Sequence, residues 1–262
     1  MHWILQSDIF SEAGWQVLLE TLRRFDLPHS VHKVVPFVGE LVPPPAVGHA
    51  NVICIGAYSM RHAAQRHGWQ PGVFDIGHQD FTRQMRHWGP HMLNAASVVS
   101  RFRDAVFTDD LLFVRPTDDS KHFAGRVFTR AEFTEWQQAV CRLQLDTGGS
   151  LTPDTLIQLA PPLRIHAEYR YWVVMGRIVT RSLYKRGDRV MYSGAVDERL
   201  DDFVNQRLAE WLPHESFVID VCDTPEGIKI DEINTLNAAG FYAADVQRLV
   251  LALDQAYSEA PR

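Results

Sequence analysis

The stretch of residues 217–242, FVIDVCDTPEGIKIDEINTLNAAGFY, constrains the fold of this chain more than any other part of the sequence. Two apolar runs flank residues 223–227, where Pro225 and Gly227 stand at positions typical of a tight turn. Runs of this length on either side of such a turn are typical of paired antiparallel strands. The pattern therefore predicts a β-hairpin that leads into a loop containing small residues.

Three oxygen-bearing side chains lie on this predicted hairpin. Glu232 and Asn234 are two residues apart and share a strand face, and pairing of the strands would bring Asp220 beside them. The same alternation predicts that Lys229 and Asp231 point to the opposite face. Carboxylate and amide oxygens suit Mg²⁺, and a carboxylate inside an apolar run needs a partner or a cation. The alternative is an ordinary solvated acidic face, which is the commoner meaning of such a pair.

Composition excludes several function classes. The 262 residues carry a net charge of −6, so no bulk basic field indicates nucleic-acid binding. No apolar run reaches the length of a membrane span. The three cysteines, Cys54, Cys141 and Cys222, are scattered and odd in number, which indicates neither a disulfide framework nor a zinc site. This cysteine usage fits the reducing cytoplasm.

The first 85 or so residues predict a small α/β unit. Its expected elements are three strands and two helices, at residues 3–5, 11–24, 31–38, 51–57 and 58–68 in the order strand, helix, strand, strand, helix. Neither GxGxxG nor GxxxxGK[ST] occurs, which argues against a Rossmann dinucleotide site and a P-loop.

The rest of the chain predicts a mixture of helices and antiparallel hairpins. Helices are expected at residues 81–88, 93–102, 129–143, 197–212 and 245–257, and strands at 111–114, 155–160 and 165–183, the last folded as a hairpin. Thr129 and Glu132 form the sequence pattern of a capping box at the start of one of these helices.

Two cations follow the strand at residues 111–114. Arg115 ends the strand and Lys121 lies in the polar loop after it, an arrangement that suits a polyphosphate. The alternative is that Arg115 caps a sheet edge or pairs with Asp118 or Asp119.

Further charged side chains lie on the hairpin of residues 165–183 and just after it. Glu168 and Arg170 share one strand face, and Lys185 lies in a basic turn. An ordinary cross-strand ion pair on a wet face, followed by a solvated turn, would produce the same pattern.

The order of these parts resembles the ATP-grasp superfamily of carboxylate–amine ligases. The quoted stretch 217–242 is similar to that family's D…E-x-N metal strands and closing loop. LLFVRPTDDSKHFAG, residues 111–125, resembles the first phosphate-binding strand and loop of a bacterial and phage clade, formerly of unknown function, in which Arg replaces the usual strand-end Lys. The resemblance covers residues 89–262, and residues 1–88 fit the α/β domain expected before it. It implies an α/β N-terminal domain followed by an α+β ATP-grasp fold, whose antiparallel sheets hold a nucleotide cleft between them.

The resemblance also implies a role for each matching residue. Asp220, Glu232 and Asn234 match the Mg²⁺ ligands. The positions implied for ATP and phosphate are the strand-end Arg115, the lid residue Lys121, the hinge residues Gln158 and Leu159, and, after the hinge, Glu168, Arg170 and Lys185. Of these, Arg115, Arg170 and Lys185 would act in catalysis.

The implied activity is ATP- and Mg²⁺-dependent amide formation. A carboxylate substrate would take the γ-phosphoryl group, and an amine would attack the resulting acyl phosphate. The substrates could be small molecules or peptides, with neither nucleic acid nor membrane as a partner. Two other functions fit the same residues: a catalytically degenerate nucleotide-binding module, and a kinase that stops after phosphoryl transfer.

Overall fold

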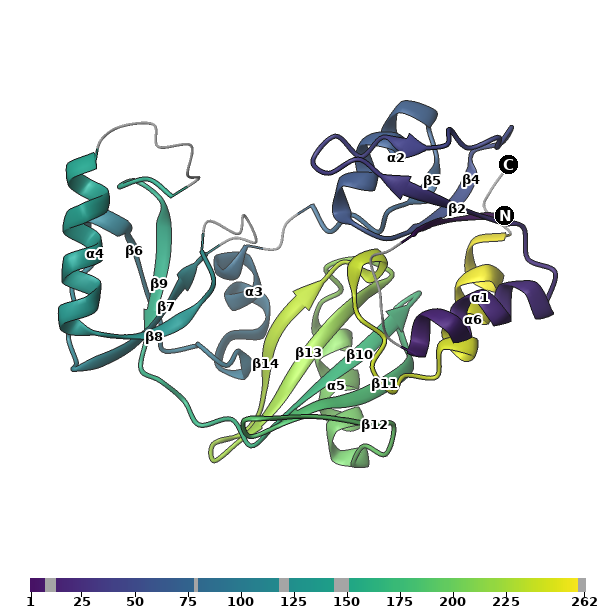
Figure 1. Cartoon of the computed structure of the whole chain (residues 1–262). Coiled ribbons are helices and arrows are strands. Elements are labelled where there is room, and N and C mark those ends of the chain that lie inside the picture. Colours follow the sequence, from purple (N-terminus) through teal and green to yellow (C-terminus); the bar gives the residue numbers. More distant parts are fainter. Residues whose placement is uncertain (8–12, 78–79, 118–122, 144–150, 259–262) are drawn as a thin grey trace. The chain divides into compact units, whose positions relative to one another are not determined.

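The structure is a computed structural model that describes residues 1–7, 13–77, 80–117, 123–143 and 151–258. Contacts divide the chain into two compact units, coloured along the sequence in Figure 1. Unit 1 combines Met1–Gly77 with Ile165–Arg262, and unit 2 is His78–Arg164. The predicted domains, 1–88 and 89–262, follow one another along the chain, whereas these units interleave along it.

The N-terminal part of unit 1 is a mixed sheet with strand order β3-β2-β1-β4-β5. Its strands are β1 (His2–Gln6), β2 (His29–Val34), β3 (Leu41–Val42), β4 (Asn51–Ile55) and β5 (Gln70–Gly72), and its helices are α1 (Ala13–Arg24), η1 (Tyr58–Met60) and α2 (Arg61–His67). All strand pairs are parallel except β2 with β3. The predicted α/β order is confirmed, including the end of α2 at Gly68, which adopts the left-handed conformation with φ +65°.

The second sheet of unit 1 is antiparallel, with order β12-β11-β10-β13-β14. Its strands are β10 (Ala167–Val174), β11 (Arg177–Arg186), β12 (Arg189–Ser193), β13 (Phe217–Thr224) and β14 (Gly227–Asn234), accompanied by α5 (Glu198–Glu210), η4 (Leu236–Ala238) and α6 (Val246–Ser258). Both predicted hairpins are present, at β10–β11 and β13–β14. Each turns where a residue has positive φ: Met175 and Gly176 in the first, Gly227 in the second.

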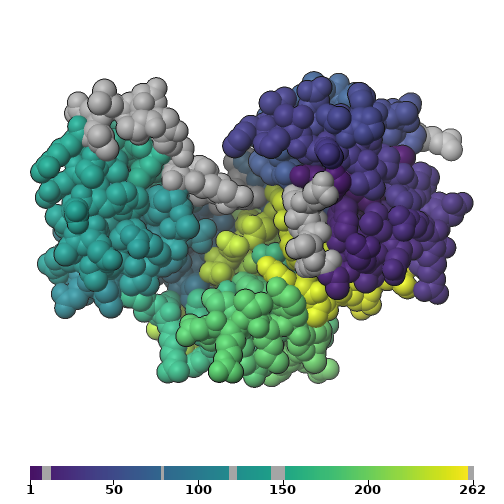
Figure 2. Space-filling view, in the orientation of Figure 1, coloured from purple at the N-terminus to yellow at the C-terminus, as the bar shows by residue number. Residues whose placement is uncertain are grey.

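The core of unit 1 joins the two ends of the chain. The apolar face of α1, formed by Trp15, Leu18 and Leu22, belongs to one buried cluster with Leu249 and Leu253 of α6. Figures 1 and 2 show the purple N-terminal segment against the yellow C-terminal one. The N-terminal sheet and the antiparallel sheet therefore share one hydrophobic core.

Unit 2 is a four-stranded antiparallel sheet of order β6-β9-β7-β8 with its own aromatic core. Its elements are α3 (Phe81–Trp88), η2 (Gly89–His91), β6 (Val98–Arg101), η3 (Phe102–Asp104), β7 (Leu111–Pro116), β8 (Arg126–Thr129), α4 (Arg130–Leu143) and β9 (Leu156–Ala160). The helix predicted at residues 93–102 is wrong. A turn comes first, and β6 then pairs with β9, so a partner distant in sequence overrides the local pattern.

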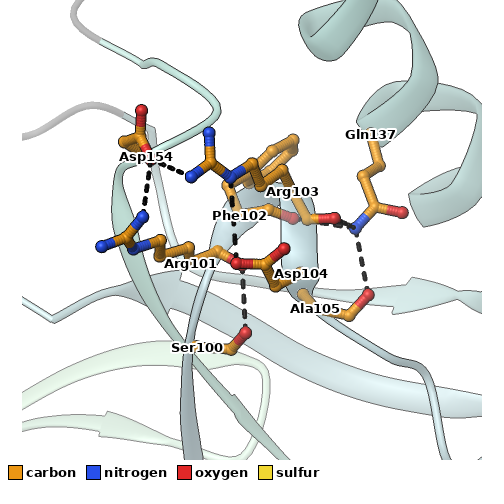
Figure 3. Close-up of polar contacts among 8 residues, drawn as sticks. All are labelled: Ser100, Arg101, Phe102, Arg103, Asp104, Ala105, Gln137 and Asp154. Atoms are coloured by element: carbon orange, nitrogen blue, oxygen red, sulfur yellow. Dashed lines mark hydrogen bonds and ion pairs between the residues drawn. The ribbon is translucent and has the colours of Figure 1, made fainter.

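Polar contacts fasten α4 and the β6–η3 segment of unit 2, as Figure 3 shows. The Gln137 side-chain amide donates to the carbonyls of Phe102 and Ala105, at 2.8 and 3.0 Å. Asp154 accepts from Arg101 at 3.3 Å and lies 3.0 Å from an Arg103 nitrogen. These contacts fix the turn between the strand and the core aromatic residues.

The predicted capping box begins α4. The backbone N–H of Thr129 donates to Oε2 of Glu132 at 2.8 Å, and the backbone N–H of Glu132 donates to Oγ1 of Thr129 at 3.2 Å. Within the described ranges, no helix combines the length and apolar character needed to cross a membrane.

Candidate active site

Arg170, Asp220 and Glu232 form a row across three neighbouring strands of unit 1. Arg170 on β10 lies opposite Asp220 on β13, which lies opposite Glu232 on β14. Nε and Nη2 of Arg170 donate to the two carboxylate oxygens of Asp220, at 2.8 and 2.7 Å. This two-pronged contact uses the planar fork of the guanidinium group and fixes both side chains.

The row is buried, and burial shapes its titration. Asp220 is 1% exposed and Arg170 8%. Burial raises the pKa of Asp220 to about 6, against the opposing effect of Arg170 and with a further rise from Glu232 and Glu168. Burial alone would lower the pKa of Arg170, but the Asp220 carboxylate more than offsets it, so this pKa is raised. Because one cation does not fully compensate the lost hydration of Asp220, a second nearby cation would stabilise its ionised form.

Glu232 and Asn234 lie on one face of β14, as their spacing predicted. Nδ2 of Asn234 donates to Oε1 of Glu232 at 2.8 Å, which orients the amide. In the part of the chain that the structure describes, no group of three His, Cys, Asp or Glu side chains is placed to hold a metal. Two carboxylates and an amide oxygen nevertheless fit Mg²⁺, which uses few protein ligands and takes the others from water and phosphate.

Two β-bulges next to this row place additional side chains near it. Asp220 pairs with Glu232 but Val221 pairs with Ile230, so Asp231 is an extra residue in β14. On β11, Tyr184 is the extra residue in the same way. Burial raises the pKa of Tyr184, and the Asp220 and Asp231 carboxylates raise it further. Asp231 therefore belongs to the electrostatic surroundings of the row.

The bulge in β14 makes the predicted alternation of this strand wrong. Lys229 pairs with Cys222, and Cys222 lies two residues from Asp220 on the same strand. Lys229 is thus on the Asp220 face and not on the opposite one. The sequence missed this because an inserted residue reverses the side-chain alternation from that point onward.

Glu168 and Lys185 form the next ion pair on this face. Nζ of Lys185 donates to Oε1 of Glu168 at 2.6 Å. This hydrogen bond raises the pKa of Lys185. Glu168 is 8% exposed, so the alternative of a wet-face pair between Glu168 and Arg170 is wrong: both are buried, and they pair with Lys185 and Asp220.

Tyrosine rings flank the row, and sequence reasoning missed them. The guanidinium carbon of Arg170 lies 5.6 Å from the ring centre of Tyr184 and 5.1 Å from that of Tyr242. Tyr242 stacks on Tyr184 at 5.0 Å and contacts Tyr192 at 5.1 Å. The closing loop supplies Tyr242 in a left-handed conformation, φ +52°, which the sequence does not signal.

In unit 2, the structure brings three predicted nucleotide residues together on β7 and β9. Arg115 pairs in register with Gln158, and Leu159 follows it along β9. Gln158 is buried and accepts a hydrogen bond from Ser97 at 3.1 Å. A Cβ added to Gly125 would lie 2.9 Å from Cβ of Arg115, so glycine allows this close approach. Lys121, Asp118 and Asp119 lie outside the described residues.

Residues 42–253 match the model of an ATP-grasp domain family, the third family of its clade. The chain belongs to this family. No curated protein matches its sequence.

Solved structures share the fold of this ATP-grasp protein at low sequence identity. D-cycloserine synthetase DcsG matches with a TM-score of 0.63 and 14% identity over 97% of this chain and 99% of that one. A RimK domain ATP-grasp protein from Sphaerobacter thermophilus matches with 0.61 and 14%, over 91% and 92%. The macrocyclase MdnC from Microcystis aeruginosa, bound to its precursor peptide, matches with 0.60 and 10%, over 99% and 100%. These likenesses confirm the predicted fold: an N-terminal α/β sheet followed by antiparallel sheets.

Proposed function

We propose that this ATP-grasp protein is a Mg²⁺-dependent carboxylate–amine ligase that forms an amide through an acyl phosphate. The observation that carries the proposal is the buried row of Arg170, Asp220 and Glu232, with Asn234 beside it. A buried row of alternating charge is costly for stability alone, which favours a functional role. Most members of the superfamily are carbon–nitrogen ligases, and the distant structural matches include such enzymes.

Each part of the row has a task in this proposal. Asp220, Glu232 and Asn234 would hold Mg²⁺, which when bound neutralises phosphate charge during phosphoryl transfer. Arg170 aligns Asp220 through two hydrogen bonds, and its position beside that carboxylate suits a phosphate contact. Lys185 is held by Glu168 and supplies a further positive charge.

The residues of unit 2 would contact the nucleotide. Arg115 ends a packed strand, and the backbone of Gln158 and Leu159 would meet the adenine, as the family resemblance implies. The remaining chemistry consists of positioning and charge neutralisation, because phosphoryl transfer needs no nucleophile from the protein.

Nucleotide binding tests the first half of the proposal. We expect ATP with Mg²⁺ to stabilise the protein against unfolding by about 2.7 kcal/mol at a hundred times its dissociation constant. Thermal unfolding with ATP alone, with ATP and Mg²⁺, and with GTP and Mg²⁺ measures this. If none of the three shifts the melting temperature, the nucleotide site does not exist.

ADP release separates the ligase from its two alternatives. A ligase releases ADP in an acid- and amine-dependent manner and forms an amide. A kinase releases ADP without amine and accumulates a phosphorylated product, and a degenerate module binds nucleotide without turnover. Mass spectrometry of the products alongside ADP measurement distinguishes all three.

A further inference from the structure

A cavity of about 380 Å³ lies in the N-terminal sheet of unit 1, at the carboxyl ends of three strands. Gln6 ends β1, Val34 ends β2, and Ala57 comes just after β4. In the strand order β3-β2-β1-β4-β5, β1 has β2 on one side and β4 on the other, so the chain reverses its direction across the sheet here. In open α/β sheets such a reversal leaves a crevice at the carboxyl ends of the strands, where ligands bind.

One wall of the cavity is an aromatic ring that does not contribute to the protein core. Phe37 is 92% exposed and has a left-handed backbone with φ +63°, which bulky residues seldom adopt. Its loop is nevertheless ordered by hydrogen bonds: the N–H of Val35 donates to Glu40 O and that of Gly39 to Val35 O, both at 2.9 Å. Folding gains little from so exposed a ring, so its placement favours contact with a ligand.

The loop that carries Phe37 is packed against another wall of the same cavity. A Cβ on Gly39 would lie 1.9 Å from the carbonyl oxygen of Ser59, which lines the cavity. Only glycine permits this approach, which holds Phe37 over the opening.

The polar groups of the cavity are hydrogen-bond donors. Oε1 of Gln6 accepts from the Ala57 N–H at 2.7 Å, so the remaining polar group of Gln6 is its amide NH₂. Arg61 stacks over the Tyr58 ring at 4.2 Å and donates to the Tyr58 carbonyl at 3.2 Å. Among the described residues, no acidic side chain lines the cavity. A cation and an amide donor next to an apolar wall suit a carboxylate attached to an apolar group.

Backbone contacts tie this cavity to the predicted metal ligands within unit 1. The N–H of Gly56 donates to Asn237 O at 2.8 Å, and Nδ2 of Asn237 donates to Gly56 O at 3.0 Å. Gly56 directly precedes the cavity residue Ala57, and Asn237 lies in the loop that follows Asn234. A molecule in the cavity would therefore be held close to the loop after the metal strands.

We propose that this cavity binds the acid substrate of the ligase, as a carboxylate adjoining an apolar and preferably aromatic side chain. Phe37 covers the side chain, and Arg61 with the Gln6 amide holds the carboxylate. The inference rests on the proposed function. A free amino-acid derivative and the C-terminal residue of a peptide share this chemistry.

Calorimetric titration of the full-length protein without nucleotide tests the binding site. The probes are N-acetyl-phenylalanine, its amide, N-acetyl-glycine, and an N-acetylated tripeptide that ends in phenylalanine. We expect the amide and the glycine derivative to bind at least about tenfold more weakly than N-acetyl-phenylalanine. Tighter binding by the tripeptide identifies a peptide substrate, and the reverse identifies a free acid.

Matched variants locate the binding. We expect Arg61→Gln and Phe37→Ala each to weaken N-acetyl-phenylalanine binding about tenfold. Arg66→Gln on the same helix and Phe25→Ala, both exposed and outside the cavity, should bind as the wild type does. Absence of binding by every probe, equal binding of acid and amide, or wild-type affinity in both cavity variants would overturn the inference.

ADP release separates this inference from the function on which it rests. Binding that depends on Arg61 and Phe37 but produces no ADP with ATP and Mg²⁺ would leave the cavity assigned and remove the ligase. Acid-dependent ADP release that Arg61→Gln and Phe37→Ala leave unchanged would retain the ligase and remove the cavity as its acid site.

Discussion

At the scale of single residues, the two-pronged contact between Arg170 and Asp220 determines which substitutions are informative. Both side chains are buried, so removal of either leaves a buried charge without its partner, at a cost of roughly 3–5 kcal/mol. Loss of activity in such a variant would be difficult to separate from loss of structure. Glu232 is only half-buried and lies at the end of the row, which makes it the better probe.

We predict that Glu232→Gln keeps the fold and reduces ADP formation about a hundredfold or more, because it removes a metal-binding charge but not the shape of the side chain. The melting temperature without metal should stay the same or rise, since Glu232 raises the pKa of Asp220 by charge repulsion. Glu226→Gln, in the exposed turn of the same hairpin, is the matched control. Full turnover by Glu232→Gln would refute the metal assignment.

Asp231 cannot serve as the control in this experiment, although strand alternation would suggest it. Its carboxylate raises the pKa of Tyr184, which lies beside Arg170. A change at Asp231 would alter the electrostatics of the row, and its effect could not be assigned to one strand face.

Thiol reactivity gives a second prediction at this scale. Burial raises the pKa of the Cys54 thiol to about 12, and burial with the Asp231 and Glu168 carboxylates raises that of Cys222. Brief treatment of the folded protein with iodoacetamide at about pH 8 should therefore modify the half-buried Cys141 first, because the thiolate is the reacting form. Peptide mass spectrometry measures the order, with a denatured sample as the control. Equal rates at Cys54 and Cys141 would contradict it.

At the scale of elements, the bulges in β11 and β14 do more for the candidate site than the regular parts of these strands. Each adds one residue next to the central strand pair and places Tyr184 or Asp231 near the buried row. Bulges are common beside active sites because they redirect a side chain without ending the sheet.

The capping box of α4 provides an element-scale prediction. Thr129→Ala should lower the free energy of unfolding by about 1 kcal/mol, because the cap satisfies backbone donors at the start of the helix. Thr134→Ala is the matched control, since its exposed hydroxyl only donates back to the Arg130 carbonyl and alanine is the better helix former. Chemical denaturation measures both variants, and an equal loss in the two would contradict the cap.

The cap should also depend on pH in a defined direction. Hydrogen bonds from the backbone and hydroxyl of Thr129 lower the pKa of Glu132. A lowered pKa in the folded state contributes stability above the ordinary value of 4.5, and this is lost as the pH falls through the lowered value. The difference between wild type and Thr129→Ala should therefore shrink in acid.

At the scale of the whole molecule, the chain passes through unit 1, then unit 2, then unit 1 again. The cluster that joins α1, β1 and α6 cannot form without both ends of the chain. Unit 2 is continuous in sequence and has a separate aromatic cluster around Phe133. The two units therefore differ in how they tolerate being cut.

We predict that a fragment of residues 78–164 folds alone, whereas a fragment of residues 89–262 does not. The second fragment keeps α6 but loses Trp3, Leu18 and Leu22, which are buried in the same cluster, and this exposes a large apolar surface. Circular dichroism and thermal unfolding of both fragments test this. As a control, replacing residues 78–164 by a short Gly/Ser linker should leave unit 1 folded. A cooperative transition in fragment 89–262 would contradict the shared core.

The sequence by itself determined the features that depend on near neighbours. The two hairpins, the shared face of Glu232 and Asn234, the capping box at Thr129, and the family follow from alternation, turn residues and motif order. These features are local because a strand face or a helix cap is set by residues a few positions apart.

Only the tertiary structure decided what depends on distant partners. The pairing of Val98–Arg101 with β9, the bulge at Asp231, the contact of Arg170 with Asp220, and the core shared by α1 and α6 each join segments far apart in the sequence. Strand propensity and register depend on which neighbour a segment meets, and local sequence does not contain that information.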